Sequence, residues 1–170
     1  MMTYLAIPFD NSSLELKGHI LGDERFDQTT GKWYRCVAVH TDLIGNTTAA
    51  GQVALVAGSN IVANKKASGI DTTNVVAAGV FAAAIAESES SSAYRYGWIQ
   101  IAGTCTVNKD TNAIAVGECI IADAATDGAC KEHADAGSVT GIILKAAMGY
   151  AIVAAAGGDA TVAAFLRFLR

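Results

Sequence analysis

The chain has 170 residues, of which 52% are hydrophobic and 16% charged, and it contains one proline. Such a chain is long enough for one domain with a buried core, and this composition disfavours a disordered protein. The formal net charge is -4, and the basic residues are scattered between Lys17 and Arg170. A nucleic-acid-binding protein normally gathers its basic residues on one face, so that class is not expected.

Residues 1–31 differ in character from the rest of the chain. The segment MMTYLAIPFDNSSLELKGHILGDERFDQTTG holds the only proline, Pro8, and no valine. We expect it to form an extended N-terminal arm ahead of a single domain over residues 32–170. The opening residues lack the basic start and long apolar run of a signal peptide. The longest apolar run, at 75–86, is shorter than the ~20 residues of a membrane span. We therefore expect a soluble protein, made in the cytoplasm, with no membrane partner.

Short runs of β-forming residues follow the arm, separated by Gly, Asn and Thr. A spacing near ten residues predicts an all-β fold, a compact antiparallel β-barrel or β-sandwich. The segment 72–90 is ambiguous because its alanines favour helix and its valines favour strand, and we assign a strand to Gly79–Ile85. A polar excursion is expected at 122–138. The other predicted strands are 33–41, 52–58, 60–65, 95–103, 113–121, one from Val139, and 162–169.

The strand RYGWIQIAG, at 95–103, is the bulkiest in the chain. Alternation places Trp98 and Gln100 on one face and Ile99 and Ile101 on the other, so at least one face should be buried. A core strand is the favoured interpretation. The alternative is that Trp98 lies with its neighbouring tyrosines at a subunit interface, where Tyr and Trp are enriched.

The cysteines, histidines and glycines of the sequence form no recognisable catalytic, metal-binding or nucleotide-binding motif. Four cysteines, Cys36, Cys105, Cys119 and Cys130, lie far apart, and we expect reduced thiols that mostly act as small buried hydrophobes. Cys130 and His133 form a C-x-x-H motif without the paired spacings of a zinc site, so no metal is expected. No dinucleotide or P-loop motif occurs, so no cofactor is expected. His19, His40 and His133 support no catalytic triad, and we predict that the chain is not an enzyme.

Several phrases of the chain together resemble a known family. These are WYRCVAVHT, AGQVAL, YGWIQIAG, VGECIIAD, GIILKA and DATVAAFLRF, spread over residues 33–169. In this combination the chain resembles the capsid decoration (cement) proteins of tailed bacteriophages. The resemblance implies a compact β-barrel on the outer surface of the virion head, bound to the major capsid protein. Members are usually trimers, strengthen the shell against internal DNA pressure, and have no catalytic residue.

The resemblance also indicates where contacts are expected. An early segment in the family often contacts the shell as an extended arm, which suits residues 1–31. The expected interface residues are the large side chains of the arm and of two strands: Tyr4, Ile7, Pro8, Phe9, Trp33, Tyr94, Tyr96 and Trp98. The alternative function is a phage surface module that binds host carbohydrate through loops 87–93 and 122–138. These loops are poor in the aromatic rings that sugar-binding sites generally use.

Overall fold

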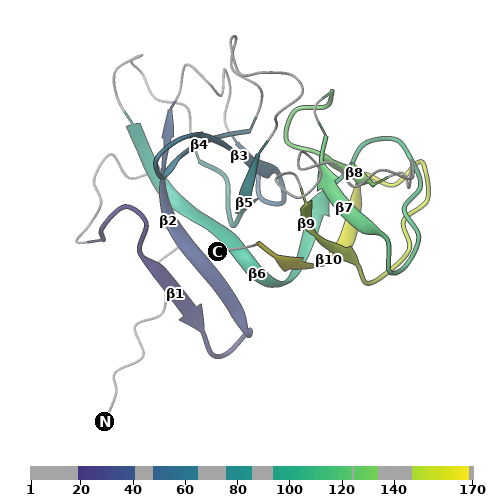
Figure 1. The fold of residues 1–170 in the computed structure, drawn as a ribbon, viewed down its shortest axis with the longest axis horizontal. Helices are drawn as coiled ribbons and strands as arrows, with labels where there is room; N and C mark the ends of the chain where they lie inside the picture. The colour runs from purple at the N-terminus through teal and green to yellow at the C-terminus, as the bar shows by residue number, and fades with distance from the viewer. Residues whose placement is uncertain are drawn as a thin grey trace.

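The protein is described here from a computed structural model, which describes residues 19–40, 48–64, 76–85, 94–123, 125–133 and 147–168. Within these ranges the regular structure consists of ten β-strands, so the predicted all-β class is confirmed (Figure 1). No helix in this described part is long and apolar enough to cross a membrane. The strands are β1 Glu24–Asp27, β2 Lys32–His40, β3 Val53–Gly58, β4 Ile61–Ala63, β5 Ala77–Phe81, β6 Tyr94–Asn108, β7 Cys119–Ala122, β8 Cys130–Glu132, β9 Ala147–Ala151 and β10 Thr161–Arg167.

Five of the strands close into a β-barrel, the first lobe of the molecule. The order β2-β4-β3-β5-β6 returns to its start because β6 also pairs with β2, from Trp33–Ala102 to His40–Tyr94. The predicted barrel is therefore present. The pairing is not antiparallel throughout, because β2 and β4 run parallel with Ala38 opposite Ile61.

The interior of this barrel is filled by its own side chains. Alternation along β6 sends Ile99 and Ile101 inward, where both belong to a buried cluster with Val37 of β2 and Phe81 of β5. Small residues let the strands approach closely. At Gly79 an added Cβ would lie 2.8 Å from the carbonyl oxygen of Gln100, too close for any other residue without a shift.

The second lobe is built on the other half of β6. The sheet continues in the order β6-β10-β9-β7-β8. A parallel bridge between Lys109 and Cys130 then brings β8 back beside the end of β6, so this lobe is also nearly closed. Its core includes Val107, Ile120, Met148 and Leu166, all at 1% exposure or less. The two lobes thus share one long strand.

The β6 strand changes lobes at a glycine. Gly103 has a φ of +94°, a conformation that side-chain-bearing residues rarely adopt. The Gln100 side chain stabilises this irregularity, because its amide donates hydrogen bonds to the carbonyl oxygens of Ala102 at 3.2 Å and Thr104 at 2.9 Å. A strand of 15 residues therefore serves two curved sheets without breaking.

Several predicted boundaries need correction. The strand expected at 113–121 begins only at Cys119, because residues 115–118 form a turn in which the Glu118 carboxylate accepts a hydrogen bond from the Ala115 amide. The polar excursion 122–138 contains β8, which sequence reasoning missed. The strand assigned to Gly79–Ile85 is β5, which begins and ends earlier. The start predicted at Val139 lies outside the described residues.

Part of the predicted arm belongs to the folded domain. Residues Glu24–Asp27 form β1, which pairs with β2 so that Glu24 lies opposite Arg35. The Arg35 guanidinium makes a 2.6 Å ion pair with the Glu24 carboxylate. The described part of the domain therefore begins before residue 32, and residues 1–18 lie outside the description.

Candidate interaction surfaces

The residues predicted to form an interface fall into three groups. Tyr4, Ile7, Pro8 and Phe9 lie outside the described residues. Trp33, Tyr94 and Tyr96 are half-buried on β2 and β6. Trp98 is buried at 3% exposure, so its side chain is not available to a partner in this fold.

The Trp98 side chain is covered by the segment that enters β1. On the outer side of the barrel it clusters with Tyr34 and Cys36 of β2. The His19 ring meets it edge to face with centroids 5.1 Å apart, and the Arg25 guanidinium carbon lies 5.9 Å from the centre of the indole ring. The core interpretation of Trp98 is therefore correct, although this core lies between the barrel and the N-terminal segment.

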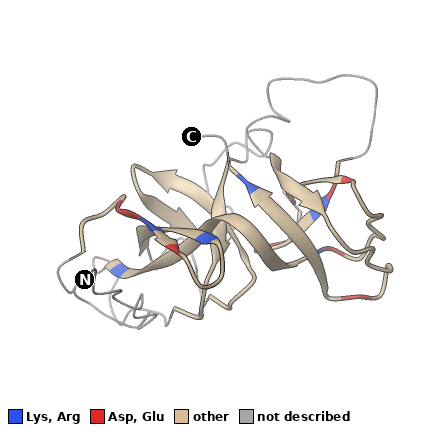
Figure 2. Cartoon of the chain, turned by 90° about the horizontal axis from the view of Figure 1, so that it is seen from below, with Lys and Arg blue, Asp and Glu red and all other residues tan. Residues whose placement is uncertain are grey.

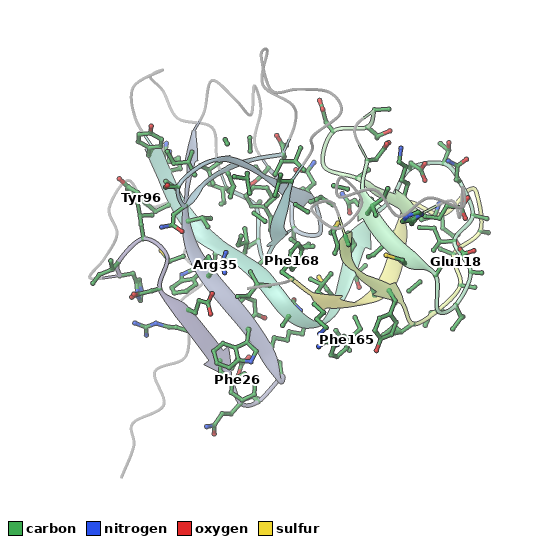
Figure 3. All side chains as sticks on the ribbon, viewed as in Figure 1. Phe26, Arg35, Tyr96, Glu118, Phe165 and Phe168 are labelled. Atoms are coloured by element: carbon green, nitrogen blue, oxygen red, sulfur yellow. The ribbon has the colours of Figure 1, made fainter. Side chains whose placement is uncertain are left out.

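Trp33 remains close to solvent at the β1–β2 hairpin. Its ring lies 5.2 Å from the ring of Phe26, which is 46% exposed. Phe26 is labelled near this hairpin in Figure 3. Aromatic side chains that are partly exposed at a hairpin suit contact with another protein, and Phe26 adds a residue that sequence reasoning did not select.

A larger apolar surface lies on the outer face of the second lobe. Tyr150 of β9 is paired with Phe165 of β10 on one side and with Cys119 of β7 on the other. The Tyr150 and Phe165 rings stack with centroids 5.6 Å apart, and Tyr150 is 45% exposed. Ile152 is exposed beside them, and its amide donates to the Ala163 carbonyl at 2.9 Å. We call Tyr150, Phe165, Cys119, Ile152 and Ala163 the Tyr150 face.

Few charges interrupt this face. Strands β7 and β9 contain no charged residue, and β10 contains only Arg167, which alternation places on the same side as Phe165. In Figure 2 the charged residues lie mostly near turns and strand ends, and long stretches of strand are tan. Val116 and Val153, at 64% and 56% exposure, extend the apolar character into the adjoining turns. Exposed apolar side chains gathered on one face make this surface a candidate interaction site.

Three of the thiols are poor nucleophiles at neutral pH. Burial raises the pKa of Cys36 and of Cys105 to about 11, and that of Cys130 to about 12. The expectation of small buried hydrophobes holds for Cys36 and Cys130, whereas Cys119 is exposed. None of the four cysteines, all of which lie in the described part of the chain, forms a disulfide bond.

Cys130 and His133, the two residues of the C-x-x-H motif, have different surroundings. Cys130 is fully buried in the core of the second lobe. The amide of His133 bonds to the carbonyl of Cys119 on the neighbouring strand. Across the described residues, no group of three or more His, Cys, Asp and Glu is placed to hold a metal ion.

A small cavity of about 50 Å³ is lined by residues of the first lobe. Its lining includes Arg35, Asn60, Val37 and Ile99. This volume admits water or a few heavy atoms. Arg35 is already paired with Glu24, so its charge is compensated within the chain.

Comparisons with known proteins give weak similarity to solved structures and no sequence match. No family model matches the chain, and no curated protein matches it. Among solved structures, the chain is similar to the N base of the head fiber protein gp8.5 of bacteriophage phi29. That similarity has a TM-score of 0.46 and 15% sequence identity, and it covers 81% of this chain and 97% of the other.

Sequence reasoning missed the Tyr150 face. Its signal was present in the run Met148–Val153, where Tyr150 and Ile152 alternate with small residues. Only the pairing of β9 with β7 and β10 shows that the two residues share one face with Phe165.

Proposed function

We propose that the chain is a structural protein of the virion of a tailed bacteriophage. In this proposal it binds the major capsid protein on the outer surface of the head and stabilises the shell against internal DNA pressure. It acts as a homotrimer. The major capsid protein is proposed as the partner because residues 33–169 resemble the capsid decoration proteins.

The observation that carries a protein-binding role is the Tyr150 face. It combines exposed large apolar side chains with strands of a closed, well-packed lobe, so the surface is displayed on a rigid support. Rigid surfaces lose little conformational entropy on binding, which favours attachment to a shell. The half-buried aromatic residues Trp33, Tyr94 and Tyr96 supply further contact area on the first lobe.

The carbohydrate alternative has less support from the described residues. Of the two loops it requires, residues 87–93 lie outside the description. The described part of the other, residues 122–123 and 125–133, contains no Phe, Trp or Tyr, and its first turn is held by a hydrogen bond from the Ala125 amide to the Asp123 carboxylate. Sugar-binding sites usually need rings at these positions, so the structural role is preferred.

The test uses phage heads from a strain that lacks the gene. Purified full-length protein is added to the heads, and attachment is measured by co-sedimentation and by imaging. The expected result is saturable binding to the outer surface and heads that survive higher temperature or osmotic shock. Absence of co-sedimentation at micromolar protein would contradict the proposal. Sedimentation equilibrium of the free protein tests the trimer.

A further inference from the structure

By itself the Tyr150 face is too small for a stable interface with a folded partner and would support only weak association. The face spans three neighbouring strands, β7, β9 and β10, with about four residues from each. The spacing between strands and the rise per residue together give it an area of roughly 200 to 300 Å². A stable protein–protein interface needs about 800 Å² from each partner. The size of the face instead suits a short extended segment of about six residues.

The chain itself contains a segment of matching chemistry. Residues 1–9, MMTYLAIPF, include no charged side chain and carry Tyr4, Ile7 and Phe9. The next residue, Asp10, is acidic, whereas Arg167 is the charge at the border of the Tyr150 face. An apolar stretch followed by an acid therefore complements an apolar face bordered by a base.

The segment is also long enough to reach the face. His19 is the first residue that the structure describes, and its ring packs on Trp98 in the first half of β6. Thr104 lies six residues after Trp98 on β6, which is a distance of ~20 Å along the strand. Strand β9 lies two strand spacings to the side of β6, which adds ~10 Å across the sheet. The direct separation is therefore ~22 Å. Ten residues of extended chain from Phe9 to His19 can span ~33 Å.

We propose that residues 4–9 of the chain dock on the Tyr150 face of the same molecule. Tethering raises the effective concentration of the segment to the millimolar range, which favours the chain's own segment over that of another copy. The contact covers exposed rings that would otherwise promote association between copies. This inference deepens the proposed function and rests on it for its meaning: the arm leaves its own face when it binds the shell.

Cys119 provides a natural probe, because its exposed thiol lies within the face beside Tyr150. Full-length Ile7→Cys is treated with diamide, and formation of the 7–119 disulfide is followed by non-reducing peptide mapping. Ser12→Cys is the matched control, since it carries the same new thiol on the same tether but in a polar stretch. The expected result is closure about tenfold faster for Ile7→Cys than for Ser12→Cys, with the disulfide formed within a single chain and at a rate independent of concentration.

Adding Tyr150→Thr to Ile7→Cys should lower the closure rate to that of the control. Tyr150 is exposed, so the fold should survive, and the melting temperature verifies this. Equal rates for the two tethered thiols would overturn the proposal. A disulfide-linked dimer whose yield rises with concentration would also overturn it, because the segment would then occupy a neighbouring copy. The experiment uses isolated protein, so its outcome is independent of whether the protein binds heads.

Discussion

Gly149 of β9 lies directly against the backbone of Phe165 on β10. A Cβ at position 149 would overlap the Phe165 carbonyl oxygen, and the φ of Gly149 is +152°. This close approach lets β9 pair with β10 and presents Tyr150, the next residue, beside the Phe165 ring. The Tyr150 face therefore depends on a glycine that lies outside it.

Gly149→Ala should destabilise the second lobe strongly. Relief of the overlap requires a backbone shift in a packed sheet, and we expect a loss of about 2 to 4 kcal/mol in the free energy of unfolding. Urea denaturation measures this loss. Gly158→Ala is the matched control, because no atom lies within 4 Å of its added Cβ, and it should change stability by less than about 0.5 kcal/mol. Similar stabilities for the two variants would refute the role assigned to Gly149.

Trp98→Ala should be among the most damaging substitutions in the first lobe. The side chain is 3% exposed and is held between β2 and the His19 ring, so truncation should cost about 3 to 5 kcal/mol. Trp33→Ala, at a half-buried position, should cost less. Melting temperature and oligomer mass are measured for both variants. If Trp98→Ala kept the wild-type melting temperature and changed only the mass, Trp98 would belong to a subunit interface instead.

The thiols should react with iodoacetamide in an order set by burial. In native protein that lacks residues 2–18, Cys119 should be alkylated within minutes, and half-buried Cys105 more slowly. Cys36 and Cys130 should react only after unfolding, because burial raises their pKa to about 11 and about 12 and so keeps them as neutral thiols at pH 8. Mass spectrometry without reduction should find four labelled cysteines in denatured protein. A protected pair would reveal a disulfide and contradict the prediction of reduced thiols.

The sequence predicted the strands that are rich in β-forming residues. WYRCVAVHT and RYGWIQIAG became β2 and β6, and the central residues of both strands are buried on both faces. Two features could not be predicted this way. The parallel pairing of β2 with β4 is a property of barrel closure, and β8 is only three residues long in a polar stretch.

The candidate sites, too, could be predicted only in part from the sequence. The burial of Trp98 could be predicted from the composition of β6. The contact of the His19 ring with Trp98 could not, because the sequence predicts that residues 1–31 form an extended arm. The Tyr150 face combines residues from three strands, β7, β9 and β10, which are separated along the chain by up to 46 positions, from Cys119 to Phe165. Local patterns carry no information about such pairings, so surfaces of this kind are found only in the folded chain.

The Asp123 carboxylate should make stability depend on pH under acidic conditions. Burial raises its pKa, but hydrogen bonds from the Ala125 amide and from Lys131, whose ammonium lies 3.0 Å away, outweigh this and give a net lowered pKa. A lowered pKa in the folded state means that the stabilisation is present above the unfolded-state value of about 3.9 and is lost as pH falls through the folded-state value.

Urea unfolding between pH 2 and 7 should show this loss in the wild type. In Asp123→Asn the free energy of unfolding should be lower at pH 7 and should decline less steeply below pH ~4. Asp127→Asn, an exposed carboxylate of the same turn, controls for the removal of one negative charge. Parallel curves for the wild type and Asp123→Asn would show that this carboxylate does not contribute.

Two truncations should separate the arm from the folded domain. Removal of residues 2–18 takes away no described strand, so the melting temperature should stay within a few degrees of the wild type. Removal of residues 2–31 also deletes β1 and the His19 ring, which exposes Trp98, and should lower the melting temperature strongly. A barrel that tolerates the longer deletion equally well would show that the N-terminal segment adds nothing to the fold.

The shorter truncation also tests what the arm does on the phage head. Under the proposed function it should abolish attachment to heads that lack the protein, because the arm would supply contacts to the shell. It should also increase self-association, since the Tyr150 face would lose the segment proposed to cover it. Adding Tyr150→Thr should reverse the self-association but leave attachment lost. Full occupancy of heads by the truncated protein would disprove the attachment role, and an unchanged sedimentation coefficient would disprove the cover.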